Sequence, residues 1–108
     1  MPDADKKRAA HQALVDRILT GKGRTSPEQR KSAFHNADVP ESLRPLIGKV
    51  VAKPQEVTAA DFGAAQAAGC SEDEIFELVV ATAVGRSTRL YEAGLTALAE
   101  ASGSAEAG

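Results

Sequence analysis

Large and reactive side chains are scarce in this chain of 108 residues, which has one Cys, one Met, one Tyr, three Phe and no Trp. A single Cys can form neither an internal disulfide nor a cysteine-based zinc site. No apolar run approaches the roughly 18 residues of a membrane-spanning helix, and the N-terminal residues lack the apolar segment of a secretory signal. We therefore expect a cytoplasmic protein with no metal, no cofactor and no membrane-spanning segment.

Alanine is the most abundant residue, with 21 copies. Alanine is the best helix former, and the chain has few of the β-branched and aromatic residues that favour sheets. We expect one all-α domain of about five helices over residues 1–101. Because burying apolar surface stabilises by about 25 cal/mol per Å², a small alanine-rich core is weak in a monomer, and a homo-oligomer is expected.

Apolar periodicity and helix start and stop signals divide the chain into segments. Ser26, Thr58 and Ser71 are predicted N-caps, and glycines end the first and fourth helices. The last helix either runs unbroken to Glu100 or kinks at Gly85, and residues 102–108 are expected to form a disordered tail. Helices are predicted over residues 4–20, 27–36, 41–53, 59–68 and 72–100.

Charge is divided unevenly, with eight basic and four acidic residues in 1–31 against five basic and eleven acidic residues in 32–108. The basic N-terminal helix could contact nucleic acid or a neighbouring subunit, or could be a solvated face. Ala65, Gly69 and Ile75 have the spacing of a helix-turn-helix. However, the second helix of that pair begins with acidic residues, which would face phosphate. Nucleic-acid binding is therefore not favoured.

Two neighbouring arginines are the best candidates for a ligand-binding site. Arg86 and Arg89 are three residues apart on one helix, so they are neighbours on its surface. Together with Tyr91 they could bind a small carboxylate ligand, because paired guanidinium groups suit carboxylates. They could equally form ion pairs with Glu77 or Glu92, or with another subunit.

Acid–base candidates are few. Asp61 and Glu77 could act as acid or base, although the helix-capping role of Asp61 explains that residue without chemistry. His35 is the better of two histidine candidates, and His11 is the weaker. Cys70 precedes a helix N-terminus, which favours a thiolate, but three acidic residues follow it. We expect Cys70 to be buried and inert.

The segments Val57–Asp61 and Ala67–Glu77, followed by Ala83 and Arg89, resemble the carboxymuconolactone decarboxylase and alkylhydroperoxidase D-like superfamily. In that family an alanine-rich helix ends in Gly and a Ser-x-x-Glu-Ile sequence opens the next helix. The resemblance covers about residues 57–100. It implies an all-helical fold that assembles into trimers, hexamers or related oligomers.

The family's peroxidatic motif is absent. Family peroxidases carry Cys-x-x-Cys-x-x-x-His before the Gly turn, and alignment on Gly69 places Pro54, Val57 and Asp61 at those positions. Thiol peroxidase chemistry needs a thiolate nucleophile and a resolving thiol, so we do not expect it. The lactone-decarboxylating branch does not need the cysteine pair, and decarboxylase or lyase chemistry stays open.

Three functions are therefore open. The expected one is a non-peroxidatic oligomeric binding or accessory protein. The second is a small lyase or isomerase with a relocated site for a carboxylate ligand. The third is a DNA- or protein-binding adaptor that uses the basic N-terminal helix.

Overall fold

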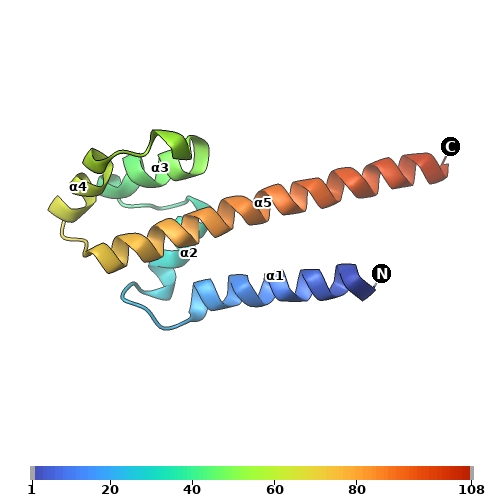
Figure 1. Ribbon diagram of the computed structural model, residues 1–108, viewed down its shortest axis with the longest axis horizontal. Coiled ribbons are helices and arrows are strands. Elements are labelled where there is room, and N and C mark those ends of the chain that lie inside the picture. Colours follow the sequence, from blue (N-terminus) through green and yellow to red (C-terminus); the bar gives the residue numbers. More distant parts are fainter. Residues whose placement is uncertain (1, 108) are drawn as a thin grey trace.

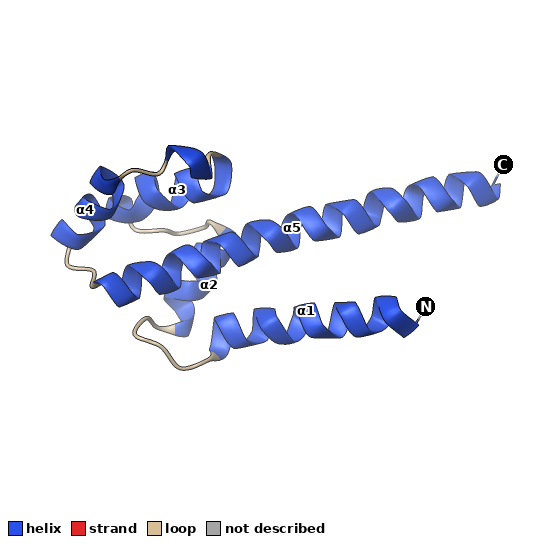
Figure 2. Cartoon of the chain, in the orientation of Figure 1, coloured by secondary structure: helices blue, strands red, loops and turns tan. Residues whose placement is uncertain are grey.

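Helices account for nearly all of the regular structure. The computed structural model describes the backbone of residues 2–107 and the side chains of residues 6–103. Within that range the chain has no strand, which confirms the all-α prediction (Figure 2). The α-helices are α1 (Pro2–Thr20), α2 (Pro27–His35), α3 (Arg44–Ala52), α4 (Ala59–Ala67) and α5 (Glu72–Ala107), and the short 3-10 helices are η1 (Glu41–Leu43) and η2 (Pro54–Glu56).

Ser26, Thr58 and Ser71 precede α2, α4 and α5 as predicted, and reciprocal capping hydrogen bonds are present at Ser26 and Ser71. Ser26 Oγ accepts from the Gln29 amide at 3.1 Å, and the Gln29 side chain accepts from the Ser26 amide in return. Ser71 and Glu74 make the same reciprocal pair. Each box satisfies donors that a helix N-terminus otherwise leaves unpaired, so these helices start where local sequence dictates.

The turn between α4 and α5 depends on Gly69. Its φ of 104° lies in the left-handed region, where a residue without Cβ is favoured. The Gly69 amide donates to the Gln66 carbonyl at 3.0 Å, and the Cys70 amide donates to the Ala65 carbonyl at 3.2 Å. This pair of bonds is a Schellman motif, which ends α4 and directs the chain into α5.

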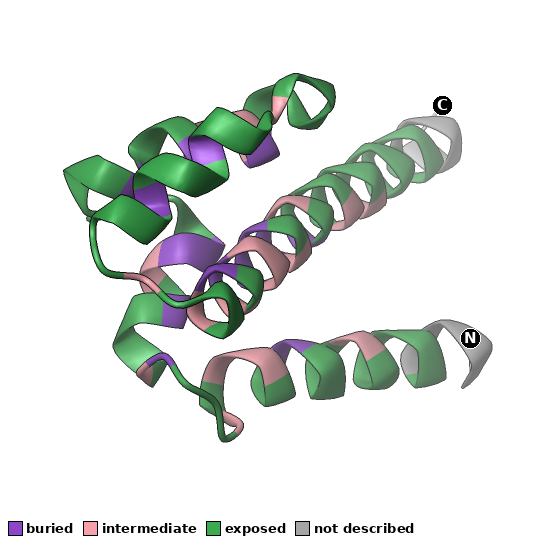
Figure 3. Cartoon of the chain, turned by 60° about the vertical axis from the view of Figure 1, so that its left-hand side comes forward, coloured by how far each residue is buried: buried purple, intermediate pink, exposed green. Residues whose placement is uncertain are grey.

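The core lies between α2, α3 and the first half of α5, with Ala65 closing it from α4 (Figure 3). α2 has the most extensive contact with α5. Gly85 permits this approach, because a Cβ at that position would overlap the carbonyl group of Phe34. The buried apolar cluster consists of Ala33, Val39, Leu43, Leu46, Ile47, Val50, Ala65, Ile75, Leu78 and Ala81.

α5 is one continuous helix of 36 residues, so the structure has no break at Gly85. A disordered tail is expected over residues 102–108, and in the structure the backbone of this segment is helical as far as Ala107. The strong helix propensity of alanine and glutamate accounts for the extension beyond Gly103. The alternative in which α5 runs unbroken is the observed one.

α1 runs antiparallel to α5, and both project away from the core as a two-helix arm (Figure 1). The molecule measures 57 × 28 × 21 Å, and its radius of gyration is 16.7 Å. A compact domain of this length has a radius of gyration of about 13 Å, so the arm makes the chain unusually extended. None of the helices within residues 2–107 has the length and hydropathy needed to cross a bilayer.

Candidate functional site

Asp61 forms structural contacts. Its carboxylate accepts from the Thr58 amide at 2.8 Å and lies 3.0 Å from Lys49 Nζ. The Thr58 amide and then the Lys49 ammonium lower the pKa of Asp61 below its ordinary value of 3.8. The carboxylate thus stays ionised as a helix cap and an ion-pair partner, which does not suit a proton-transfer role at neutral pH.

Glu77 anchors the loop between α1 and α2. Its Oε1 accepts from the Thr25 amide at 2.9 Å and from the Thr25 hydroxyl at 2.7 Å, and its Oε2 accepts from the Arg24 amide at 2.7 Å. The Thr25 and Arg24 amides hold the pKa of Glu77 below its ordinary value of 4.5. Gly23 makes room for this carboxylate, because a Cβ there would lie against it.

The two predicted ligand arginines have different surroundings. Arg89 donates from Nη1 to the Phe34 carbonyl at 2.7 Å, which secures the C-terminal end of α2 on α5. Arg86 is half-buried, and none of the ion pairs among the described side chains involves it. Neither arginine shares a partner with Asp61 or Glu77, so the structure does not bring these candidates together.

Tyr91 contacts a histidine instead. The rings of His11 and Tyr91 lie 5.1 Å apart. His11 Nε2 lies 3.0 Å from Thr88 Oγ1, whose single proton goes to the Val84 carbonyl. These contacts join α1 to α5.

In the described structure, His35 and Cys70 pack against neighbouring side chains. His35 is exposed at the end of α2, with its ring 5.0 Å from that of Phe34. Cys70 is half-buried and packs against the core beside the Schellman turn. Pro54 lies in η2 and Val57 directly follows it, so the family's thiol positions here carry no thiol.

A cleft lies under the α1–α2 loop, which we call the loop cleft. Its volume is about 200 Å³, and three of its lining side chains are basic against one carboxylate. Apolar side chains from α1 and α5 form the rest of its wall. The lining residues are Arg17, Ile18, Lys22, Arg30, Phe76, Glu77 and Val80.

Arg30 is the unusual group in the loop cleft. It is only 5% exposed, and its Nη1 donates to the Ile18 carbonyl at 2.9 Å. Its Nε has no hydrogen-bond partner, and no described carboxylate lies within ion-pair distance of the guanidinium. Burying a charge is costly unless the charge is paired, so this guanidinium is suited to an anion.

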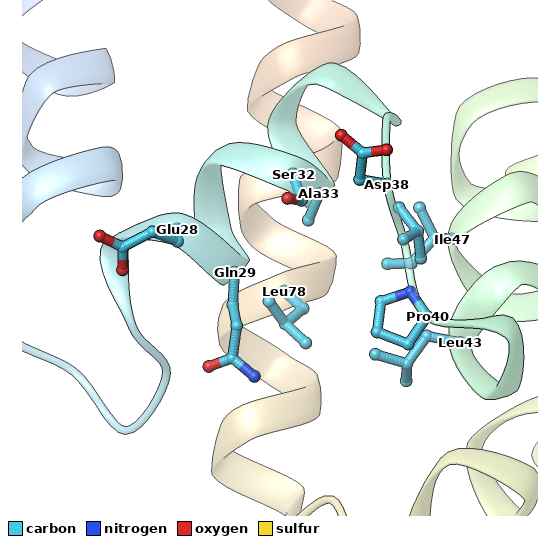
Figure 4. Close-up of a pocket in the computed structure, with 10 residues that line it drawn as sticks. Glu28, Gln29, Ser32, Ala33, Asp38, Pro40, Leu43, Ile47 and Leu78 are labelled. Carbon is cyan, nitrogen blue, oxygen red and sulfur yellow. The ribbon is translucent and has the colours of Figure 1, made fainter.

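A second cavity, of about 170 Å³, lies between α2, α3 and α5 (Figure 4). Buried aliphatic side chains including Leu43, Ile47 and Leu78 form its floor. Asp38 and Glu28 stand at its rim, and none of its lining residues is basic. This cavity therefore disfavours an anionic ligand.

Sequence reasoning missed Arg17, Lys22 and Arg30. Arg30 lies in a short helix whose large buried apolar side chain is Phe34. Charged residues are almost never fully buried, so burial of Arg30 is not expected from the sequence. No local pattern indicates that this arginine turns inward. The only available signal was the excess of basic residues in 1–31, which was attributed to α1 as a whole.

Comparison of this chain with protein-family models, with curated proteins and with solved structures finds no match. The family resemblance of residues 57–100 therefore stays a prediction. Within the described side chains, no group of three or more His, Cys, Asp or Glu residues could hold a metal ion.

Proposed function

We propose that this protein is a non-peroxidatic helical binding protein whose loop cleft takes a small organic anion, such as an aromatic carboxylate. The observation that carries the proposal is the buried Arg30 guanidinium, which lacks a carboxylate partner at the wall of the cleft. Arginine is the side chain best suited to bind a carboxylate, because its donors are arranged as a planar fork. The sequence also leaves a small carboxylate ligand open, at Arg86 and Arg89.

The cleft offers one surface to the carboxylate of such a ligand and another to its hydrocarbon part. Arg17 and Lys22 add positive charge beside Arg30, while Ile18, Phe76 and Val80 offer apolar surface to a hydrocarbon body. Glu77 contributes one negative charge, stabilised by three hydrogen bonds from the loop, so the three basic side chains still exceed the one carboxylate of the cleft. The cleft thus combines an apolar wall with an excess of positive charge, although Arg30 also interacts electrostatically with Glu77.

The lyase or isomerase alternative receives less support. Acid–base chemistry needs a group that exchanges protons near the operating pH. The one carboxylate in the loop cleft is Glu77, whose pKa is lowered by the loop amides. Binding without turnover is therefore the function that this geometry favours.

The test compares three probes that share a benzene ring and differ in charge: benzoate, benzyl alcohol and benzylamine. Each is titrated into labelled protein, and amide chemical shifts are followed by NMR. Benzoate is expected to move the resonances of Arg17, Lys22, Arg30 and Phe76, and benzylamine is expected to leave them in place. Equal shifts with benzylamine, or no shifts with benzoate at millimolar concentration, would contradict the proposal.

A pair of lysine variants provides the matched control. Lys22 lines the cleft, whereas Lys31 is exposed on α2 and does not. Lys22→Gln should weaken benzoate binding several-fold, because it removes one of three cations, and Lys31→Gln should leave it unchanged. An equal effect of both substitutions would show that the interaction is a general attraction to basic surface.

A further inference from the structure

The distal half of α5 exposes an apolar face that no described part of the chain covers. Leu90 is 62% exposed and Leu98 is 64% exposed, and every described side chain from Thr96 to Gly103 is exposed. Leu90, Gly94 and Leu98 follow one another at intervals of four residues, so they share one face of the helix. Small residues flank them on that face at Ala83, Ser87, Ala97 and Ala101.

The amount of surface indicates a partner of substantial size. The chain exposes 7263 Å², whereas a monomeric protein of 11.2 kDa exposes about 5,700 Å². The excess is about 1,600 Å² per chain, and two chains could therefore bury about 3,200 Å², within the range of obligate homodimers. Isolated helical segments are also marginal without tertiary packing, and the distal part of α5 has little of it.

We infer that α5 pairs with α5 of a second copy of this chain, antiparallel, about a two-fold axis at Gly94. Leu90 lies four residues before Gly94 and Leu98 four residues after it, so this axis places Leu90 of each copy opposite Leu98 of the other. No contact within the single chain requires a glycine at position 94, because a Cβ there would meet nothing within 4 Å. In the pair, the missing Cβ of Gly94 leaves room for the two helices to approach. An exposed glycine inside a helix costs about 1 kcal/mol relative to alanine, and the crossing gives it a packing role.

Charge sets the direction and the register of the pair. Arg86 and Glu100 are separated by nearly four helical turns, so both lie on the same edge of the apolar face. Arg86 lies about 12 Å before Gly94 and Glu100 about 9 Å after it along the helix. Antiparallel pairing at Gly94 therefore places Arg86 of each copy beside Glu100 of the other. A two-fold axis at Ser87 would instead place the two Arg86 side chains together.

The first experiment measures mass by sedimentation equilibrium at micromolar concentration, with circular dichroism as a check on folding. The wild-type chain should be a dimer, and Gly94→Leu should be a folded monomer. Gly63→Leu is the matched control, because Gly63 is also a helical glycine with nothing within 4 Å of an added Cβ, and this variant should stay dimeric. A monomeric wild type, or an assembly of any size that survives Gly94→Leu unchanged, overturns the inference.

The second experiment tests the register by charge reversal. Arg86→Glu and Glu100→Arg should each weaken association by about tenfold, because like charges then face each other twice in the dimer. The double variant restores opposite charges and should return to wild-type affinity. A double variant no stronger than the single ones overturns the pairing at Gly94, even if the chain is dimeric.

Discussion

At the scale of single residues, Gly85 leaves the least room for a side chain among the glycines within residues 2–107. An alanine Cβ there would overlap the Phe34 carbonyl, which belongs to the backbone and cannot rotate away. Arg89 holds the same carbonyl from the next turn of α5. Two neighbouring positions on α5 thus specify one contact with the end of α2.

Gly85→Ala should lower the free energy of unfolding by about 3 kcal/mol, because overpacking forces a backbone shift. Gly48→Ala is the control, since Gly48 lies inside α3 with nothing within 4 Å of an added Cβ. That variant should be neutral or more stable by up to about 1 kcal/mol, because alanine favours helix. Urea denaturation measures both, and equal behaviour of the two variants would contradict the close contact at Gly85.

At the scale of the elements, the α1–α2 loop is held to α5 by one side chain. Glu77→Ala removes the acceptor of three hydrogen bonds and should cost about 2 kcal/mol in the free energy of unfolding. Asp73 is the control, because its contact with Arg24 is long at 4.0 Å and exposed on both sides, and Asp73→Ala should be nearly neutral. Guanidinium denaturation distinguishes the two, and a neutral Glu77→Ala would remove the anchoring role.

The local signals of the helices could be predicted from sequence, and the contacts between helices could not. Ser26, Ser71 and Gly69 act within a few residues of themselves, so their turn and cap roles follow from residue type. The contacts of Glu77 with Thr25, of Arg89 with Phe34 and of His11 with Thr88 join residues 52, 55 and 77 positions apart. Such pairings depend on how helices pack, and neither composition nor periodicity specifies them.

The candidate site shows the same difference between residue types, which the sequence reveals, and contacts between helices, which it does not. The sequence indicated that basic residues and a carboxylate ligand belong together, but it placed them at Arg86 and Arg89. The proposal of the loop cleft rests instead on the burial of Arg30, and burial is a property of the folded chain. Glu77 is a candidate acid or base in the sequence, and in the structure its hydrogen bonds hold the loop between α1 and α2.

At the scale of the whole molecule, stability should fall in acid. The pKa values of Asp61, Glu74 and Glu77 are all lowered, chiefly by hydrogen bonds from backbone amides. A carboxylate with a lowered pKa in the folded state contributes stability above its unfolded pKa and loses it as pH falls through the folded one. The free energy of unfolding should therefore decline below about pH 4.5. Denaturant titrations at several pH values measure the decline, which should be shallower in Glu77→Gln. Identical pH profiles of the wild type and the variant would show that the Glu77 carboxylate does not contribute to the decline.

Because α5 is one continuous helix, a small change of its angle in the core displaces its far end. The helix is about 54 Å long, and its packing against α2 and α3 lies in its first half. A tilt of about 5° where Gly85 meets Phe34 would move the far end, about 33 Å away along the helix, by about 3 Å. The direction in which Leu98 points is therefore decided about 20 Å away along the helix, by a backbone contact in the core.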